Sequence, residues 1–470
     1  MDQTPKSSKT VSFYTVGCRL NQAETSIFVD RFQSQGYQVV EFGEPTDLLI
    51  LNTCSVTEGA EADCRRVVRK ILRTSPEAFV AVTGCYAQTG MAQLSTIPGV
   101  DLIFGNQFKM DLPAYLQTLP DWSKKQEPAI RYSRHLDRET FVIEGTGAYE
   151  HTRANLKIQD GCNFMCSFCL IPYARGRERS RHIDDALREA EALVKRGHKE
   201  LVLTGVNIGR YGLQASSLLA LIQQLEDIDG LERIRISSIE PTTIPDELID
   251  FMASSSKLCR YFHVPIQSGD DRILQAMNRR YSVQDYVTWI QRVVDKIPGV
   301  CLGTDVMVGF PGESDSQFAN TRAVLADLPL AYFHVFSYSE RPGTPALRFP
   351  NKVESGTIKQ RSRELTKLSQ DKRMWFYQRG VGTNVEVLFE SQKAGGLWTG
   401  FTDNFIRVGV PCAEPVANQI KNVLVTGVMD GLAVGKMMDS VLPSDQHAQS
   451  PSPRMGETVL PPSRWELVVP

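Results

Sequence analysis

The chain has 470 residues, of which 42% are hydrophobic and 23% charged, with 52 Lys and Arg against 54 Asp and Glu. This is the composition of a folded globular protein, so disorder or a coiled-coil rod is excluded for the chain as a whole. The net charge of -2 also excludes a globally basic nucleic-acid binder, although a local basic patch is compatible with it. No apolar run approaches the roughly 20 residues of a membrane span, and residues 1–9 are polar, so a cytoplasmic protein is expected.

Between residues 9 and 122, short apolar runs alternate with amphipathic stretches. The runs are VSFYTV (11–16), QVVEF (38–42), DLLILN (47–52), FVAVTG (79–84) and DLIFG (101–105). Strands that alternate with helices favour a parallel sheet, so an N-terminal α/β domain is expected here. Residues 111–151 carry Pro113, Pro120 and Pro128 among many polar residues, which predicts a linker.

A second alternating series extends from about residue 148 to 378. Its strand candidates are NLKIQD (155–160), ELVLTG (200–205), RIRISS (233–238), RYFHVP (260–265), CLGTDVMVGF (301–310) and AYFHVFS (331–337). Successive β/α units of this kind predict a partial (β/α)6 barrel, and the loops after its strands would form the catalytic end. The chain as a whole is therefore expected to be an α/β protein.

The last part of the chain has a different pattern. Residues 379–440 are rich in β-type runs and glycine turns, which predicts a small antiparallel β-barrel. Residues 443–470 are rich in proline and serine and cannot bury much apolar surface, so a disordered tail is expected there.

Ten cysteines in a reducing compartment indicate metal binding or catalysis rather than disulfides. The segment GCNFMCSFC (161–169) places Cys162, Cys166 and Cys169 in C-x3-C-x2-C spacing, directly after the first strand of the second series. Zinc usually takes four ligands in paired spacings, and the nearest histidines, His151 and His182, are not well placed to supply a fourth. Three thiolates suit a [4Fe–4S] cluster with one open iron, and a structural zinc site is the alternative.

Three other cysteines are far apart in sequence but share one setting. Cys18, Cys54 and Cys85 each follow an apolar strand by one or two residues. The carboxyl ends of parallel strands lie along one edge of a sheet, so these side chains can converge there on a ligand. The alternative is three small buried residues at strand ends. The remaining cysteines have no such setting and are interpreted as structural: Cys64, Cys259, Cys301 and Cys412.

With both sets of three cysteines, the chain resembles the methylthiotransferase family of radical S-adenosylmethionine enzymes over about residues 11–440. The segments that carry the resemblance are GCRLNQAET (17–25), LNTCSVTEGAEADCRR (51–66), TGCYAQ (83–88), IQDGCNFMCSFCLIPYARGRERSR (158–181), VPIQSGDDRILQAMNRRY (264–281) and DVMVGFPGES (305–314). The resemblance implies two [4Fe–4S] clusters. Cys162, Cys166 and Cys169 would hold the one whose open iron binds S-adenosylmethionine, with Phe168 at the motif's usual aromatic position. Cys18, Cys54 and Cys85 would hold the other.

The family's reaction replaces a C–H bond by C–S–CH3 through a 5′-deoxyadenosyl radical. It implies no catalytic side chain beyond the clusters, and the sequence offers no Ser–His–Asp or paired-carboxylate constellation. GCRLNQAET most resembles the branch that acts on C2 of N6-threonylcarbamoyladenosine at position 37 of tRNA. Other branches act on isopentenyladenosine in tRNA or on an aspartate of a ribosomal protein. An electron donor and a sulfur source are implied but not identified. A non-catalytic zinc- and RNA-binding protein is the alternative from another class.

Binding of tRNA is expected from two features. The C-terminal β segment resembles a TRAM domain, an RNA-binding barrel, and its Trp398, Phe401 and Phe405 could stack on bases or pack in the core. Basic residues flank both proposed cofactor loops, and they are open to two interpretations, a solvated face or contact with phosphates. They are Arg175, Arg177, Arg179 and Arg181 in one stretch and Arg65, Arg66, Arg69 and Lys70 in the other.

Overall fold

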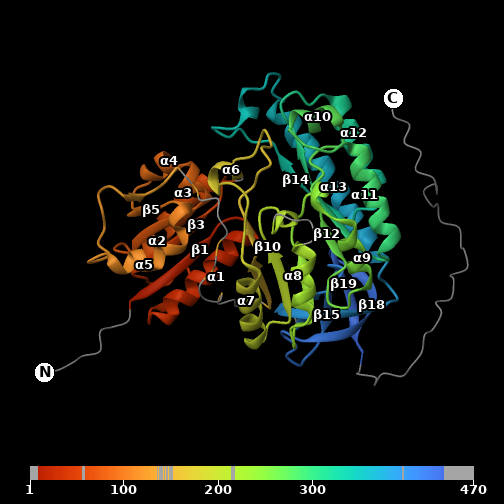
Figure 1. Ribbon diagram of the computed structural model, residues 1–470, viewed down its shortest axis with the longest axis horizontal. Helices are drawn as coiled ribbons and strands as arrows, with labels where there is room; N and C mark the ends of the chain where they lie inside the picture. Colours follow the sequence, from red (N-terminus) through yellow and green to blue (C-terminus); the bar gives the residue numbers. More distant parts are fainter. Residues whose placement is uncertain are drawn as a thin grey trace, which may run out of the picture.

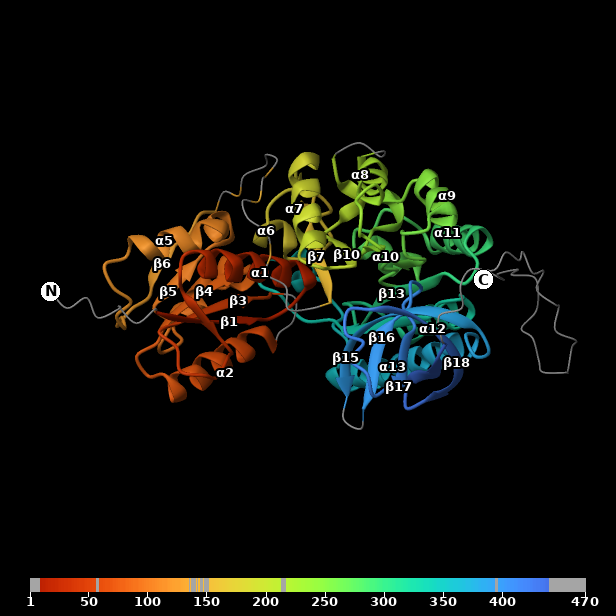
Figure 2. The same cartoon turned by 90° about the horizontal axis from the view of Figure 1, so that it is seen from below.

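The computed structural model describes residues 9–55, 59–134, 136, 141, 143, 147, 152–212, 217–393 and 396–438. The predicted disordered tail at 443–470 lies outside the described residues, as does part of the predicted linker. The N-terminal sheet domain and a larger barrel lie side by side, and a small β-barrel lies against the larger barrel (Figures 1 and 2). No described helix is long and apolar enough to cross a membrane.

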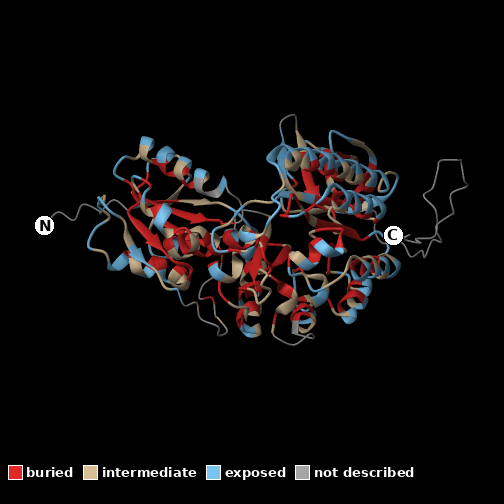
Figure 3. Cartoon of the chain, turned by 90° about the horizontal axis from the view of Figure 1, so that it is seen from above, coloured by how far each residue is buried: buried red, intermediate tan, exposed pale blue. Residues whose placement is uncertain are grey.

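The N-terminal domain is built on a six-stranded sheet with the order β2-β1-β3-β4-β5-β6, in which every pairing is parallel. Its elements are β1 (Thr10–Thr15), α1 (Arg19–Ser34), β2 (Gln38–Val40), β3 (Leu48–Thr53), α2 (Gly59–Thr74), β4 (Phe79–Gly84), α3 (Cys85–Thr89), α4 (Met91–Ser95), β5 (Leu102–Phe104), η1 (Asn106–Asp111), α5 (Leu112–Thr118) and β6 (Ala129–Arg131). All residues of β3 and β4 are buried, because helices cover both faces of the sheet (Figure 3). This explains why these strands have continuous apolar runs instead of alternating ones.

The linker prediction at 111–151 is wrong for its first part. Pro113 lies in the first turn of α5, where its missing N–H costs nothing, and β6 pairs with β5 as the sixth strand. The segment between them is tied to the sheet, since Lys124 Nζ lies 2.5 Å from Asp101 Oδ2. The N-terminal sheet therefore continues past residue 122.

The larger barrel has six parallel strands, as the sequence predicts: β7 (Arg153–Lys157), β10 (Glu200–Thr204), β11 (Arg233–Ile236), β12 (Tyr261–His263), β13 (Cys301–Val308) and β14 (Tyr332–Ser337). Two three-stranded sheets, β11-β10-β7 and β12-β13-β14, are joined by bridges between Ile234 and Leu258 and between Ser238 and His263. Within the described residues no pairing joins β14 to β7, so the barrel is open on that side. Helix α1 of the N-terminal domain packs beside β7 (Figure 2).

Helices surround the barrel strands, and one large apolar core lies between the two layers. The helices are α7 (Ile183–Lys195), α8 (Ser217–Glu226), α9 (Asp246–Ser254), α10 (Asp271–Ala276), α11 (Val283–Lys296), α12 (Asp315–Asp327) and α13 (Ser355–Gln378). The loop after β7 carries a short pair of strands, β8 (Gln159–Asp160) and β9 (Arg179–Ser180), and the one-turn helix α6 (Ile171–Ala174).

The C-terminal part is a closed five-stranded barrel with the order β15-β16-β17-β19-β18. The strands are β15 (Asn384–Lys393), β16 (Leu397–Phe401), β17 (Arg407–Pro411), β18 (Ile420–Met429) and β19 (Leu432–Met437). The pairings are antiparallel except for that of β17 with β19, which is parallel.

This small barrel docks on the amino ends of the larger barrel's strands. Arg233 donates to the carbonyls of Phe401 and Glu386 at 2.9 Å, and Arg235 donates to the carbonyl of Asp403 at 2.7 Å. Arg153 pairs with Glu390 at 2.6 Å. The cysteine loops lie at the carboxyl ends of the strands, so the two ends of the larger barrel face different partners.

Candidate functional site

The loop at 161–169 follows β8 and brings three cysteines to the carboxyl end of the larger barrel. Gly161 has φ +72°, and a side chain there would collide with the carbonyl of Arg177, so only glycine allows the turn that leads into Cys162. Cys166 is buried, whereas Cys162 and Cys169 are half-buried. Phe168 packs against a small apolar cluster next to the loop.

All three sulfurs of this loop receive hydrogen bonds from N–H groups. The backbone N–H of Phe164 donates to Cys162 Sγ at 3.3 Å, and that of Ile171 donates to Cys169 Sγ at 3.4 Å. Arg279 donates to Cys166 Sγ at 3.3 Å. Burial raises the pKa of Cys162 and Cys169 to about 12, so free thiols would be protonated at neutral pH. A bound cation supplies the charge that turns them into thiolates.

Cys18, Cys54 and Cys85 lie at the carboxyl edge of the N-terminal sheet, after β1, β3 and β4. Cys54 and Cys85 are buried and Cys18 is exposed. Gly17 has φ +110°, and a Cβ built on it would lie 2.6 Å from Cys54 Cβ and 2.8 Å from Cys54 Sγ. The loop that carries Cys18 therefore approaches Cys54 as closely as the backbone allows. Convergence of all three cysteines on one ligand stays a prediction.

Neither cysteine set has the geometry of a preformed single-ion site. Three sulfurs on one tetrahedral zinc would lie about 3.8 Å apart, given Zn–S bonds of about 2.3 Å. In the part of the chain that the structure describes, the only group of three or more His, Cys, Asp or Glu residues with ligand atoms all within 4.8 Å of one another is His263, Asp305 and His334. The three thiols of the 161–169 loop, which are set further apart and each receive a hydrogen bond from an N–H group, fit a multi-iron cluster.

Two cavities meet between the cysteine sets. The loop cavity, of about 500 Å³, is lined by Cys169 and by Ser55, the neighbour of Cys54. The lumen cavity, of about 680 Å³, occupies the inside of the larger barrel and extends to Cys18 of the N-terminal domain. Asp305 and Phe336 line both cavities. A molecule that occupied them would be in reach of residues from both cysteine sets.

A buried ionic network joins the two domains beneath the cysteines. Arg175 Nε donates to Cys85 Sγ at 3.2 Å, and its NH1 lies 3.0 Å from Glu24 Oε1 and 3.1 Å from Asp160 Oδ1. Lys157 pairs with Glu24 at 2.7 Å and with Asp160 at 2.9 Å. Burial alone would raise the pKa of Glu24, but Arg175, Lys109 and Lys157 hold it well below its ordinary value. No sequence pattern predicts a role for Glu24, Asp160, Lys109 and Lys157, because buried charges on separate elements leave no local pattern.

The predicted basic stretch at 175–181 is not an exposed surface. Arg175 is buried in the network, and Arg181 is buried between Asp185 and Glu189. Both side chains form ion pairs inside the protein, so they are not accessible for direct contact with RNA. Arg177 and Arg179 are half-buried, and for them RNA contact stays a prediction.

The aromatic residues of the C-terminal barrel face the larger barrel. Trp398 is buried in a core that also contains Tyr261 and Tyr332. Phe405 stacks on Phe401 at 4.8 Å between ring centroids and packs on Tyr261 at 4.7 Å. Phe401 and Phe405 line the lumen cavity, at the end opposite to the loop cavity. Core packing thus accounts for Trp398, and the other two close the barrel.

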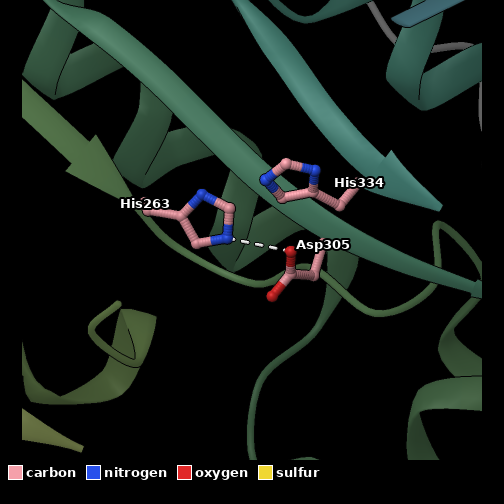
Figure 4. Close-up of side chains that lie close together, drawn as sticks. All are labelled: His263, Asp305 and His334. Atoms are coloured by element: carbon pink, nitrogen blue, oxygen red, sulfur yellow. Dashed lines mark hydrogen bonds and ion pairs between the residues drawn. The ribbon is translucent and has the colours of Figure 1, made fainter. Parts of the chain in front are cut away.

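His263, Asp305 and His334 project into the lumen from β12, β13 and β14 (Figure 4). His263 Nε2 lies 2.9 Å from Asp305 Oδ1, and its Nδ1 lies 3.3 Å from the hydroxyl of Tyr332, which in turn lies 2.7 Å from the hydroxyl of Tyr261. Both ring nitrogens of His263 therefore already have partners. His334 packs on the His263 ring at 5.5 Å between centroids. No motif in the sequence predicts a site at these residues.

A parallel α/β barrel with three cysteines on the loop after its first strand defines a radical S-adenosylmethionine protein. Residues 156–325 match the family model described as "Radical SAM superfamily", and residues 10–105 match "Uncharacterized protein family UPF0004". In fold, the chain is similar to the radical S-adenosylmethionine methyltransferase TsrM from Kitasatospora setae, with a TM-score of 0.56 and 16% identity over 72% of this chain and 75% of that one.

Curated relatives cover almost the whole chain. The threonylcarbamoyladenosine tRNA methylthiotransferase MtaB of Bacillus subtilis is 34% identical over 88% of this chain and 93% of its own length, and that of Aquifex aeolicus is 36% identical over 80% and 92%. A tRNA-2-methylthio-N(6)-dimethylallyladenosine synthase of Clostridium perfringens is 31% identical over 90% and 97%. The chain belongs to the methylthiotransferase family of radical S-adenosylmethionine enzymes. Its radical domain implies S-adenosylmethionine and a [4Fe–4S] cluster as cofactors.

Proposed function

We propose that this protein methylthiolates C2 of N6-threonylcarbamoyladenosine at position 37 of tRNA. The observation that carries the proposal is that Cys169 and Cys18, from different cysteine sets, line two cavities with a common wall at Asp305 and Phe336. Forming a C–S bond at an unactivated carbon requires a radical source and a sulfur source within reach of one base. The names of the relatives in Bacillus and Aquifex support the choice of nucleoside.

In this proposal Cys162, Cys166 and Cys169 hold a [4Fe–4S] cluster that binds S-adenosylmethionine in the loop cavity, and Cys18, Cys54 and Cys85 hold a second cluster. When bound, these groups supply the radical chemistry that breaks an unactivated C–H bond and delivers sulfur. The protein's own groups balance charge and exclude water. Arg279 donates to Cys166 Sγ and pairs with Glu240, and Arg175 donates to Cys85 Sγ inside the buried network.

The tRNA partner would contact more than one part of the chain. We assign the predicted domains to three roles: residues 9–122, extended by β6 to residue 131, and residues 148–378 bind the cofactors, and residues 379–440 form an RNA-binding barrel. The exposed basic residues of α2, Arg66, Arg69 and Lys70, follow the Cys54 loop and offer phosphate contacts. An electron donor and a sulfur source would have to come from other molecules.

The test is anaerobic turnover followed by analysis of nucleosides. The protein is given S-adenosylmethionine, dithionite, sulfide and tRNA that carries threonylcarbamoyladenosine, and digested tRNA is analysed by mass spectrometry. We expect the mass of one added methylthio group on that nucleoside and about eight irons per chain. Product only on dimethylallyladenosine would move the enzyme to the neighbouring branch. Bound zinc without iron would favour a non-catalytic RNA-binding protein.

A further inference from the structure

The lumen cavity has an excess of positive charge. Four arginines line it, and among the residues that the structure describes Asp305 is the only acidic one in its wall. One of the four, Arg235, is neutralised by Glu200 at 2.7 Å. The other three are Arg19, Arg373 and Arg407, and none of them has an ion pair with a carboxylate among the residues that the structure describes.

These three arginines come from three different parts of the chain and meet around one end of the cavity. Arg19 opens helix α1 next to Cys18, Arg373 lies on α13 with its guanidinium 5.2 Å from the Tyr332 ring, and Arg407 begins β17. Nε of Arg407 is buried and lacks a hydrogen-bond partner within the described parts of the chain. All three arginines are half-buried, and Arg373 and Arg407 lie over the rings of Tyr332 and Phe401. Because their charge is partly removed from water and no carboxylate of the described residues pairs with it, a bound anion would stabilise them.

His334 adds a hydrogen-bonding group on the same wall. It is exposed to the cavity, and its contacts within the described residues are ring packing against His263 and Tyr332. His263 lies behind it, and both of its ring nitrogens are hydrogen-bonded, one to Asp305 and one to Tyr332. The His263 ring is therefore held in place, whereas the His334 ring faces the cavity (Figure 4). His334 thus has ring nitrogens available for a ligand.

The two nucleosides named for the relatives differ in the group attached to N6. A dimethylallyl group is apolar and uncharged, whereas a threonylcarbamoyl group ends in a carboxylate and a hydroxyl. Placing an apolar group among unpaired guanidinium groups would leave them without partners, which costs free energy. A carboxylate would pair with them, and arginine is well suited to bind carboxylates through two parallel hydrogen bonds.

We propose that this end of the lumen cavity is the specificity pocket for the carboxylate-bearing substituent of the base, with Arg373 and His334 contacting the substituent and Arg19 and Arg407 providing the positive field. This inference rests on the proposed function and deepens it, because it assigns the choice between the two nucleosides to named residues. The base itself would lie toward Asp305 and Phe336, where the lumen cavity meets the loop cavity.

The experiment compares Arg373→Gln and His334→Phe with Lys367→Gln, a control on the same helix whose exposed side chain pairs with Asp371 outside the cavity. Anticodon stem-loops carry threonylcarbamoyladenosine, its neutral carboxamide analogue, dimethylallyladenosine or unmodified adenosine. Binding is measured without S-adenosylmethionine, and kcat/KM is measured with it. For Arg373→Gln we expect a loss of about 10- to 100-fold with threonylcarbamoyladenosine, the usual effect of removing a hydrogen bond to a charged group. The carboxamide and dimethylallyl substrates should change little.

An equal loss for all four stem-loops would show that Arg373 contacts RNA phosphates or supports the fold, and would overturn the proposal. Wild-type protein that binds the carboxylate and carboxamide substrates equally well would also overturn it. Stoichiometric zinc or manganese lost in His334→Phe would assign His334 to a metal site instead. If wild-type protein prefers the carboxylate substrate in binding but never methylthiolates it, the pocket stands and the proposed reaction fails. Turnover of both nucleosides without preference leaves the reaction class standing and overturns the pocket.

Discussion

At the scale of single residues, the two cysteine sets are expected to have separable roles. Cys166→Ala removes a buried sulfur that receives a hydrogen bond from Arg279, and no other cysteine lies on that loop besides Cys162 and Cys169. We expect reductive formation of 5′-deoxyadenosine to fall below detection, because the cluster needs all three cysteines and the loop has no other ligand to replace Cys166. The measurement is anaerobic turnover with dithionite, analysed by chromatography. Cys259→Ala, at another buried cysteine of the same domain, is the matched control.

Cys54→Ala tests the second set. This variant should still cleave S-adenosylmethionine, because the proposed S-adenosylmethionine site lies in the larger barrel and not on the N-terminal sheet. It should add no methylthio group to tRNA. Cys64→Ala is the control, since Cys64 is buried in the core of the same domain and away from the strand edge. Each substitution removes one sulfur, so we expect both to cost about 1–2 kcal/mol or less in stability. Normal methylthio product from Cys54→Ala would exclude an essential role for this set.

At the scale of elements, the network between α1, β7 and the loop around α6 couples the two cofactor domains through buried charge. Burial would raise the pKa of Asp160, but Lys157, Arg175 and Arg179 lower it, and Glu24 is affected in the same way. A carboxyl group whose pKa is lower in the folded state than in the unfolded state stabilises the protein at pH values above the unfolded-state pKa. That stabilisation is lost as the pH falls toward the folded-state pKa. Stability should therefore decrease below about pH 4.5, where unfolded carboxyl groups begin to bind protons.

Arg175→Met tests this coupling. It leaves Glu24 and Asp160 with fewer cations, so their pKa values rise and the acid transition moves to higher pH. The loss at neutral pH should be about 3–5 kcal/mol, as for breaking a buried ion pair. Urea unfolding at a series of pH values, with all proteins in the same cluster state, measures both effects. Arg322→Gln removes an exposed pair with Glu364 and should cost about 1 kcal/mol or less. Indistinguishable acid transitions for the two variants would contradict the interpretation.

At the scale of the whole molecule, the C-terminal barrel docks at the end of the larger barrel that is remote from the cysteine loops. Deleting the chain after Arg379 removes β15 to β19 but neither cysteine set, so iron content and cleavage of S-adenosylmethionine should largely survive. Affinity for tRNA should fall about tenfold or more, and binding by the intact chain should weaken steeply with salt if phosphate contacts dominate. A chain that ends at Met438 keeps all five strands and is the control. Equal affinity of both truncated proteins would place the RNA anchor elsewhere.

The sequence by itself determined the order of the elements and the places of the six proposed ligands. Buried parallel strands need continuous apolar runs, and each proposed ligand follows such a run at the edge where strand ends meet, so local pattern was sufficient. Local sequence pattern failed where the position of a residue depends on contacts between distant segments. Prolines at 113, 120 and 128 indicated a linker, yet β5 recruits β6 into the sheet. The sequence predicts that Arg175 faces solvent or RNA phosphates, but it lies among carboxylates supplied by α1 and β8.

Only the tertiary structure decided which charged residues line the lumen cavity. Arg19 is far in sequence from Arg373 and Arg407. Each of the three is an ordinary basic residue in its local sequence. They meet because α1 packs beside the open side of the larger barrel, α13 packs against β14, and the C-terminal barrel closes the amino end of the strands. Charge in a cavity is a sum over all the elements that surround it, and no local period in a sequence records that sum.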